Sequence, residues 1–337
     1  MKKINRRTFI NTFSMITAGL GIMPLQFCKP TLKTDVTFFV VGDTHFDPPP
    51  ETDQYYHVLA MNKLGNRDRV WPDLINRKTT GFGGSGKTID PASGVILVGD
   101  ITDKADPSAL ELLKTRYQQG NAERQIRYPV YVGLGNHDID PQGPPEDPDF
   151  NRRMMWAYVE QRHKGTNAPV PVANFDPESR NYSWDWGKLH LVQCHRYPGD
   201  TVKGQVNSLD WLRDDLQKYA GDGRPVVICQ HIGFDDWALG WWTDEERQAL
   251  NSVLKGFNII AIFAGHNHVA MNLKWENYPV LQVNNAWPEI GSGNDDGNGS
   301  FLMVHVTDSY MDAVTCRWTN DQGDTEFVEP FFTQKIN

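Results

Sequence analysis

Five short clusters of polar residues carry side chains that could bind metal ions. Each cluster follows a run of apolar residues and contains aspartate, asparagine or histidine. In chain order the clusters are Asp43-Thr44-His45, Gly99-Asp100, Gly135-Asn136-His137-Asp138, Gln230-His231 and Gly265-His266-Asn267-His268. Oxygen and imidazole donors without sulfur suit Mn, Fe or Zn better than calcium or a structural zinc site with thiolates.

The clusters contain more ligands than one ion needs. A carboxylate shared by two ions holds them roughly 3.5–4 Å apart, which suits an in-line displacement at phosphorus. Such ions also lower the pKa of bound water and so supply hydroxide at neutral pH. The residue types therefore predict two divalent transition metals, of the Mn, Fe or Zn class, and hydrolysis of a small phosphorylated substrate.

Buried strands and amphipathic helices must position these clusters. Short β-branched apolar runs predict strands at 36–41, 95–98, 130–134, 189–192, 225–229, 259–264, 280–283, 301–306 and 313–318. Helices are predicted at 108–117 after Asp106-Pro107, at 150–161, at 208–219, and after the Thr243 and Glu246 capping box. Alternating elements followed by a strand-rich end, 280–332, predict an α/β sandwich of mixed sheets. Strand carboxyl ends would then gather the clusters along one edge.

The ordered clusters resemble the motifs of the calcineurin-like metallophosphoesterase superfamily over residues 43–268. The resemblance implies a four-layer α/β/β/α sandwich of two mixed sheets with flanking helices. It implies two catalytic residues, Asp100 as the ligand that bridges two metals and His137 as the group that stabilises the phosphate and protonates the departing oxygen. The implied ligands are Asp43, His45, Asp100 and His268 for one metal, and Asp100, Asn136, His231 and His266 for the other.

One position departs from the purple acid phosphatases, which resemble this pattern otherwise. Those enzymes place an iron-binding tyrosine three residues after the bridging aspartate, where this chain has Asp103. The sequence therefore predicts a colourless or mixed-metal centre instead of a tyrosinate–iron centre.

The segment Gly81-Phe82-Gly83-Gly84-Ser85-Gly86-Lys87-Thr88 matches the letters of a phosphate-binding P-loop. A P-loop needs a buried strand before it and a helix after it, but polar residues 77–80 precede this segment and Asp90-Pro91 follows. We therefore expect a surface loop within an insertion at about 47–93. A nucleotide-binding P-loop remains the alternative, and Lys87 contacting the substrate is an intermediate hypothesis.

The substrate is less determined than the chemistry. Loops at strand ends set specificity, and the candidate contacts are Trp241, Trp242, Lys87 and His195, which adjoins Arg196. Aromatic residues near the metals could stack on a sugar, a base or an inositol ring, or they could cap the core. The prediction leans to phosphomonoesters of small sugars, inositols or nucleotides. The alternatives are a phosphodiesterase for lipid headgroups or cyclic nucleotides, and a metal-binding scaffold without activity.

The amino terminus reads as a processing segment. Basic residues at 2–7 precede an apolar stretch at 9–25, and Asn5-Arg6-Arg7-Thr8-Phe9-Ile10 resembles a twin-arginine signal. We predict an export signal and tether at 1–32 and one domain at 33–337, exported to the periplasm or surface of a bacterium without a stable membrane span. Lipid anchoring at Cys28 is disfavoured because bulky Phe27 precedes it.

Composition excludes other classes. The formal net charge of −9 argues against binding duplex nucleic acid, and four scattered cysteines argue against a disulfide framework. Cys229 lies inside an apolar run and is predicted to be a core thiol. Four histidines outside the motifs are expected to be structural or on the surface; these are His57, His163, His190 and His305. The oligomeric state is not predicted.

Overall fold

The structure is a computed structural model that describes residues 33–48, 56–65, 69–286 and 299–336. The predicted export signal at 1–32 and the possible lipidation site at Cys28 lie outside the described residues. The described residues from Lys33 onward belong to one compact unit. Among the helices of the described ranges, none has the length and apolar character that a membrane span requires.

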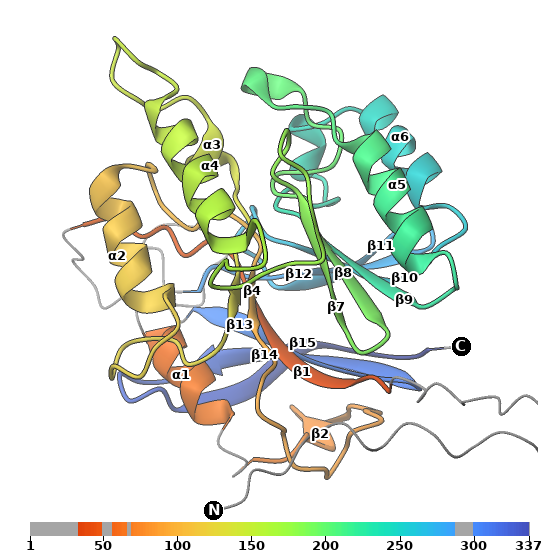
Figure 1. Cartoon of the computed structure of the whole chain (residues 1–337). Helices are drawn as coiled ribbons and strands as arrows, with labels where there is room; N and C mark the ends of the chain where they lie inside the picture. Colours follow the sequence, from red (N-terminus) through yellow and green to blue (C-terminus); the bar gives the residue numbers. More distant parts are fainter. Residues whose placement is uncertain (1–32, 49–55, 66–68, 287–298, 337) are drawn as a thin grey trace, which may run out of the picture. The chain divides into compact units, whose positions relative to one another are not determined.

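Two mixed sheets dominate the described part of the chain (Figure 1). In the first sheet, β1, β4 and β5 are parallel to one another, and the three carboxyl-terminal strands add to β1 in antiparallel fashion. Its order is β15 (Thr325–Lys335), β14 (Tyr310–Trp318), β13 (Ser300–Thr307), β1 (Asp35–Val41), β4 (Val95–Leu97) and β5 (Val130–Tyr131).

The second sheet has four parallel neighbours at its centre, β12, β10, β9 and β8, with antiparallel strands at both edges. Its order is β11 (Met271–Trp275), β12 (Tyr278–Gln282), β10 (Asn258–Ala264), β9 (Pro225–Cys229), β8 (Leu189–Gln193), β7 (Tyr182–Trp186) and β6 (Asn174–Phe175). A separate short hairpin pairs β2 (Leu74–Ile75) with β3 (Lys78–Thr79).

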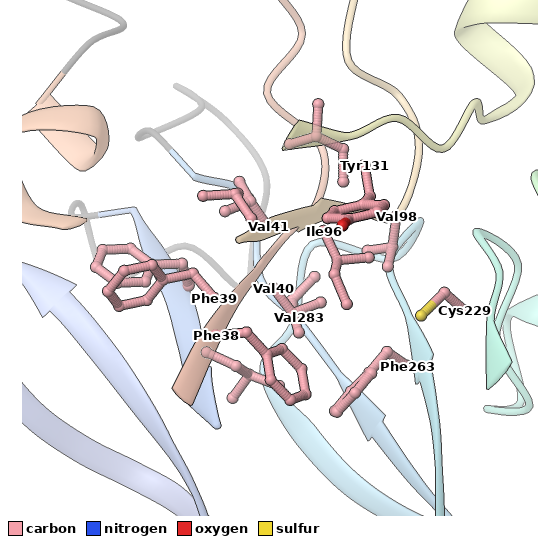
Figure 2. Close-up of a cluster of buried hydrophobic side chains, with 14 of the residues drawn as sticks. Phe38, Phe39, Val40, Val41, Ile96, Val98, Tyr131, Cys229, Phe263 and Val283 are labelled. Carbon is pink, nitrogen blue, oxygen red and sulfur yellow. The ribbon is translucent and has the colours of Figure 1, made fainter. Parts of the chain in front are cut away.

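Alternate residues of β1 show how the sheets pack. The Phe38 ring lies 6.0 Å from the ring of Phe263 in β10 and 5.2 Å from that of Trp186 in β7. The next residue, Phe39, points to the other side of β1, where its ring lies 5.7 Å from Phe301 (Figure 2). Because successive side chains of a strand point to opposite faces, one face of β1 meets the second sheet. The two sheets therefore pack face to face around a shared apolar core.

Helices cover the sheets. Apolar residues of α5 (Leu209–Ala220) and α6 (Asp244–Leu254) form a second core with residues of β8, β9 and β10 (Figure 1). Residues of α1 (Tyr56–Leu64), α2 (Pro107–Tyr117) and α4 (Phe150–His163) belong to the first core, and the one-turn helix α3 is Asn136–Ile139. The mixed α/β class is confirmed. The order of four layers stays a prediction.

The predicted strands and helices are present, and two helix starts have the predicted contacts. The Asp106 carboxylate accepts hydrogen bonds from the Ser108 and Ala109 amides, and Thr243 forms the capping box with Glu246. Elements that the sequence reading missed include α1, β7, β11 and β15. β15 contains Pro330, which an edge strand tolerates because one side of the strand has no ladder to interrupt.

His57 offers a test of the core around α1. The side chain is fully buried beside the Phe46 and Tyr117 rings, and neither ring nitrogen has a hydrogen-bond partner. Burial lowers the pKa of His57 from 6.5 to about 3. Between these values the unfolded chain binds the proton and the folded chain does not, so stability is lost as the pH falls below 6.5.

We therefore expect His57→Phe to reduce the acid sensitivity of folding. Through His57, wild type should lose about 2 kcal/mol of unfolding free energy between pH 8 and pH 5. The variant should not show this loss. Urea unfolding of both proteins at these two pH values measures the difference. An identical pH dependence in the two proteins would show that His57 has the same pKa in the folded and in the unfolded chain.

Candidate metal centre

The fold brings the five clusters together because each follows the carboxyl end of a strand. β1, β4 and β5 are parallel neighbours in one sheet, and β9 and β10 are parallel neighbours in the other. The Asp43 amide donates to the Gly99 carbonyl at 3.0 Å, and the Gly265 amide donates to the His231 carbonyl at 2.9 Å. An isolated bridge between Gly42 and Asn285 joins the two sheets beside the clusters.

Two motif glycines are required by the closeness of the ligands. A Cβ atom at Gly99, where φ is +102°, would lie 2.5 Å from Nδ1 of His231. A Cβ atom at Gly135 would lie 2.1 Å from Oδ1 of Asp100. Any side chain at either position would therefore displace a predicted ligand, which explains why glycine precedes Asp100 and Asn136.

The backbone at the clusters is strained. Five of the predicted ligands have positive φ, a region that costs roughly 1–3 kcal/mol for each non-glycine residue and that is common at functional sites. They are Asp43 (54°), His45 (40°), Asp100 (47°), His266 (81°) and His268 (55°). These positive φ values turn neighbouring side chains toward one centre, in a backbone conformation that non-glycine residues rarely adopt.

One group of potential ligand atoms comes from Asp43, His45 and His268, whose atoms lie within 4.8 Å of one another. The Nε2 atoms of His45 and His268 are 3.0 Å apart, and Nε2 of His268 lies 3.5 Å from Oδ1 of Asp43. Asp43 is fully buried, and its carboxylate also accepts the backbone amide of His266. These three residues are the predicted ligands of the first metal, apart from the shared ligand Asp100.

A second group comes from Asp100, His231 and His266. Nε2 of His231 lies 3.1 Å from Oδ2 of Asp100, 3.1 Å from Oδ1 of Asn136 and 3.2 Å from Nδ1 of His266. Nδ1 of His231 donates to the Val98 carbonyl at 2.9 Å, so Nε2 keeps its lone pair for a metal. Burial lowers the pKa of His266 to about 3, which keeps this imidazole neutral as a ligand must be.

Asp100 lies between the two groups. Its Oδ2 atom is 3.1 Å from Nε2 of His231 and 4.0 Å from Nε2 of His45. Burial raises the pKa of Asp100, but electrostatic attraction to His231, a hydrogen bond with His231 and attraction to His45 outweigh burial and hold this pKa well below its usual range. The described donors are nitrogen and oxygen atoms without sulfur, which fits divalent transition metals.

His137 is oriented for acid–base chemistry. Its backbone amide donates to Oδ1 of Asp100 at 2.9 Å, and its Nδ1 donates to the Asp103 carbonyl at 2.8 Å. The proton on Nδ1 leaves Nε2 available to a substrate, and 40% of the side chain is exposed. Oδ1 of Asp103 lies 3.6 Å from Nδ1 of both His45 and His137, a contact that the sequence reading missed.

A family model described as calcineurin-like phosphoesterase matches residues 36–270. The chain belongs to the calcineurin-like phosphoesterase family. Membership of this family supports the metal-dependent phosphoester hydrolysis that the residues predicted. The matched region includes all five clusters at the strand ends described above.

Two known proteins illustrate the family relationship. One relative, named "Probable cyclic nucleotide phosphodiesterase" in Rhodococcus erythropolis (strain PR4 / NBRC 100887), is 27% identical over 231 residues. That match covers 64% of this chain and 66% of the relative, slightly under two thirds of its length. A solved dimetal phosphatase from Danio rerio has a TM-score of 0.54 at 12% identity, over 87% of this chain and 98% of its own. The latter likeness supports the fold.

Among the candidate substrate contacts, two adjacent tryptophans of the phosphoesterase differ in position. The Trp241 ring lies 4.5 Å from the ring of His266, edge to face, so Trp241 borders the centre. Trp242 is buried, packs on Tyr197 at 4.6 Å and donates its indole N–H to the Gly233 carbonyl. Trp242 is therefore a core residue of the phosphoesterase and does not face a substrate.

His195 is a buried residue that contacts two of the strand ends next to the predicted ligands. The side chain is 3% exposed, its Nδ1 accepts from the Leu134 amide at 3.2 Å, and its Nε2 donates to the Arg180 carbonyl at 2.9 Å. Its carbonyl accepts the His231 amide at 2.7 Å. These bonds tie two strand ends together, so His195 is placed to position the predicted ligands.

Lys87 is not brought to the centre. Its Nζ donates to the Tyr310 hydroxyl at 3.1 Å beside the β13–β14 turn, and Thr307 of that turn pairs with Asp35 at the start of β1. Asp43, in contrast, follows the end of β1. The Gly83 and Gly84 amides donate to the Asp312 carboxylate, and no described helix follows Thr88 directly. The loop therefore lacks the free amides and the helix of a P-loop.

The other histidines and cysteines have structural contacts. His163 bonds to the Val132 amide and the Val170 carbonyl, His190 lies between Asp185 and Asp215, and His305 pairs with Asp35. Cys194 and Cys229 are free and buried, as expected of core thiols.

Asp103 is expected to position both histidines that it contacts. Asp103→Asn should reduce kcat about 10- to 100-fold, the usual effect of a residue that orients metal ligands. Steady-state kinetics together with metal affinity would check this effect. Unchanged kcat and affinity in the variant would show that only the Asp103 carbonyl matters, since that group is retained.

Proposed function

We propose that this phosphoesterase is a dinuclear-metal phosphodiesterase that cleaves nucleotide diesters of the cyclic nucleotide class. The observation that carries the dinuclear assignment is the position of Asp100, within 4.0 Å of ligand nitrogens from both groups. Asp43, His45 and His268 would hold one metal, Asn136, His231 and His266 would hold the other, and Asp100 would serve both. When bound, such ions stabilise negative charge on phosphate oxygens and lower the pKa of water.

The protein side chains would bind and orient the substrate around these ions. In its doubly protonated form, His137 would donate from Nε2 to a phosphate oxygen and pass that proton to the departing oxygen, while its Nδ1–H stays bonded to the Asp103 carbonyl. Asp103 would keep this imidazole in place, and the buried ligand cluster would exclude bulk water. His137 is thus the proposed general acid.

The relative favours the diester alternative over the phosphomonoester prediction. The matching region of 231 residues shares 27% identity with a protein named for cyclic nucleotides. The exposed aromatic residues beside His266 are compatible with a base-containing substrate.

Metal content and substrate preference test the proposal together. We expect two transition metals per chain and faster hydrolysis of bis-p-nitrophenyl phosphate and cyclic AMP than of p-nitrophenyl phosphate. Faster monoester hydrolysis would restore the phosphomonoesterase prediction for sugars, inositols or nucleotides. Full metal occupancy with no turnover of any phosphoester would point to a metal-binding scaffold.

Export is a further part of the proposal and rests on the amino-terminal sequence. The paired Arg6-Arg7 before an apolar stretch supports delivery of a folded enzyme out of the cytoplasm of a bacterium. Fractionation of bacteria that express the full chain, with and without Arg6→Lys and Arg7→Lys, would check it. Retention of activity in the exported fraction of the variant would contradict the twin-arginine assignment.

A further inference from the structure

Two tryptophans form a wall beside one predicted metal ligand. The ring of Trp237 lies 4.5 Å from the His266 ring at an interplanar angle of 33°, and the Trp241 ring meets the same imidazole edge to face at 4.5 Å. The two indoles are 6.1 Å apart. Trp237 is 56% exposed, whereas His266 beneath it is 5% exposed. An aromatic surface therefore faces solvent directly above the metal centre.

The local backbone holds Trp237 out of the core. Oδ1 of Asp235 accepts the Trp237 and Ala238 amides at 3.0 and 3.2 Å, which starts the short 3₁₀ turn Ala238–Gly240. Buried Trp242 anchors the other end of the segment, immediately before α6. A large apolar side chain that stays 56% exposed forgoes much of the stabilisation that burial would give, which suits a surface that a ligand covers.

We propose that Trp237 and Trp241 form the base-stacking wall of the substrate site, so that the substrate is a nucleotide with a flat aromatic base. This inference rests on the proposed function and names its substrate class. A phosphate at the metals would place its attached nucleoside along the indoles, because His266 belongs to the predicted ligand set and contacts both tryptophans. Indole rings stack on any base, since each base has a π face.

The charges near Trp237 and Trp241 narrow the class of substrate further. Exposed carboxylates of Asp236 and Glu245 lie in the same segment and the first turn of α6, where Asp244 is paired with Arg247. They would repel additional phosphates beyond the one at the metals. A cyclic nucleotide, with a single negative charge, therefore fits this edge better than a nucleoside triphosphate.

The test compares two diesters on the full-length, metal-loaded protein: cyclic AMP and the same cyclic ribose phosphate without a base. Trp237→Ala should raise KM for cyclic AMP about 5- to 100-fold, the usual range for loss of one base stack, with kcat little changed. The base-free diester should react as in wild type. Trp237→Phe should recover most of the affinity, because the phenyl ring still stacks.

Controls separate stacking from support of His266. Leu239→Ala removes an exposed apolar side chain, 47% exposed, from the same turn and should leave both substrates unaffected. Metal content and thermal midpoints of all variants should match wild type. Equal loss on both diesters would overturn the inference, since it would show that Trp237 only holds His266.

The two proposals can fail separately. If wild type cleaves bis-p-nitrophenyl phosphate but neither binds nor cleaves cyclic AMP, the wall does not accept a base although the diesterase proposal stands. If no diester is cleaved, the proposed function fails. Titration of tryptophan fluorescence with cyclic AMP then tests whether Trp237 and Trp241 bind a base. Saturable quenching that Trp237→Ala weakens would support the inference, and the absence of quenching would overturn it.

Discussion

Asp100→Asn is expected to release both metals and to lower kcat/KM by at least about 10³-fold. Electrostatic stabilisation by bound ions is worth several kcal/mol, and each 1.36 kcal/mol changes a rate tenfold. The substitution keeps the size of the side chain but removes the one carboxylate that approaches ligand nitrogens of both groups, His45 and His231. Its negative charge is what the neighbouring histidines stabilise in the folded chain.

Elemental analysis and kinetics on the purified variant would measure this result. Asp215→Asn is the matched control, because Asp215 is also a buried carboxylate, bonded to His190 and Ser183 outside the centre. We expect the control to lose stability while it retains both metals. An Asp100→Asn protein with two tightly bound metals would contradict the shared role of Asp100.

His137→Ala is expected to keep both metals and to reduce kcat by roughly 10²–10⁴, the usual contribution of general acid–base catalysis. His137 is not among the predicted ligands of either metal, although its ring lies close to His45 and Asp103, and its Nε2 is the nitrogen left free by the bond to the Asp103 carbonyl. The loss should be largest for a diester with an alkyl leaving group. A p-nitrophenolate leaving group needs less help from a proton and should lose less.

The test compares an alkyl leaving group with a p-nitrophenolate leaving group. Kinetics of cyclic AMP and of bis-p-nitrophenyl phosphate, with metal content measured in parallel, would give the two ratios. His305→Ala serves as the control, because His305 pairs with Asp35 at the far end of β1. Full activity of His137→Ala toward the alkyl leaving group would remove His137 from the role of general acid.

The ligand clusters were predictable because their signal is local. A run such as Val36–Val41 can only be a buried strand, and the polar residues after it must then lie at the strand's carboxyl end. The same reasoning correctly gave the starts of α2 and α6, where Asp106 and Thr243 cap their own helices. Edge strands such as β15 carry a weaker signal, because their residues are only partly buried and alternate less regularly.

The contacts around the ligands were not predictable in the same way. Nothing in the sequence distinguishes Trp241 at the centre from Trp242 in the core, because the choice depends on how the loop packs against Tyr197. Asp103 differs from other polar loop residues only through its distance to two imidazoles. Lys87 occurs in a motif typical of phosphate binding, yet tertiary packing places its loop against Asp312 and Tyr310.

By itself, the sequence indicated the family and predicted the chemistry and the candidate metal ligands, since these depend on residue types at strand ends. Only the tertiary structure decided that the two ligand groups meet at Asp100, that His195 is a buried support and that Trp237 stands exposed over His266. The physical reason is that such relations join residues from different strands and loops. Their distances follow from the packing of two sheets, which no local pattern of residues encodes.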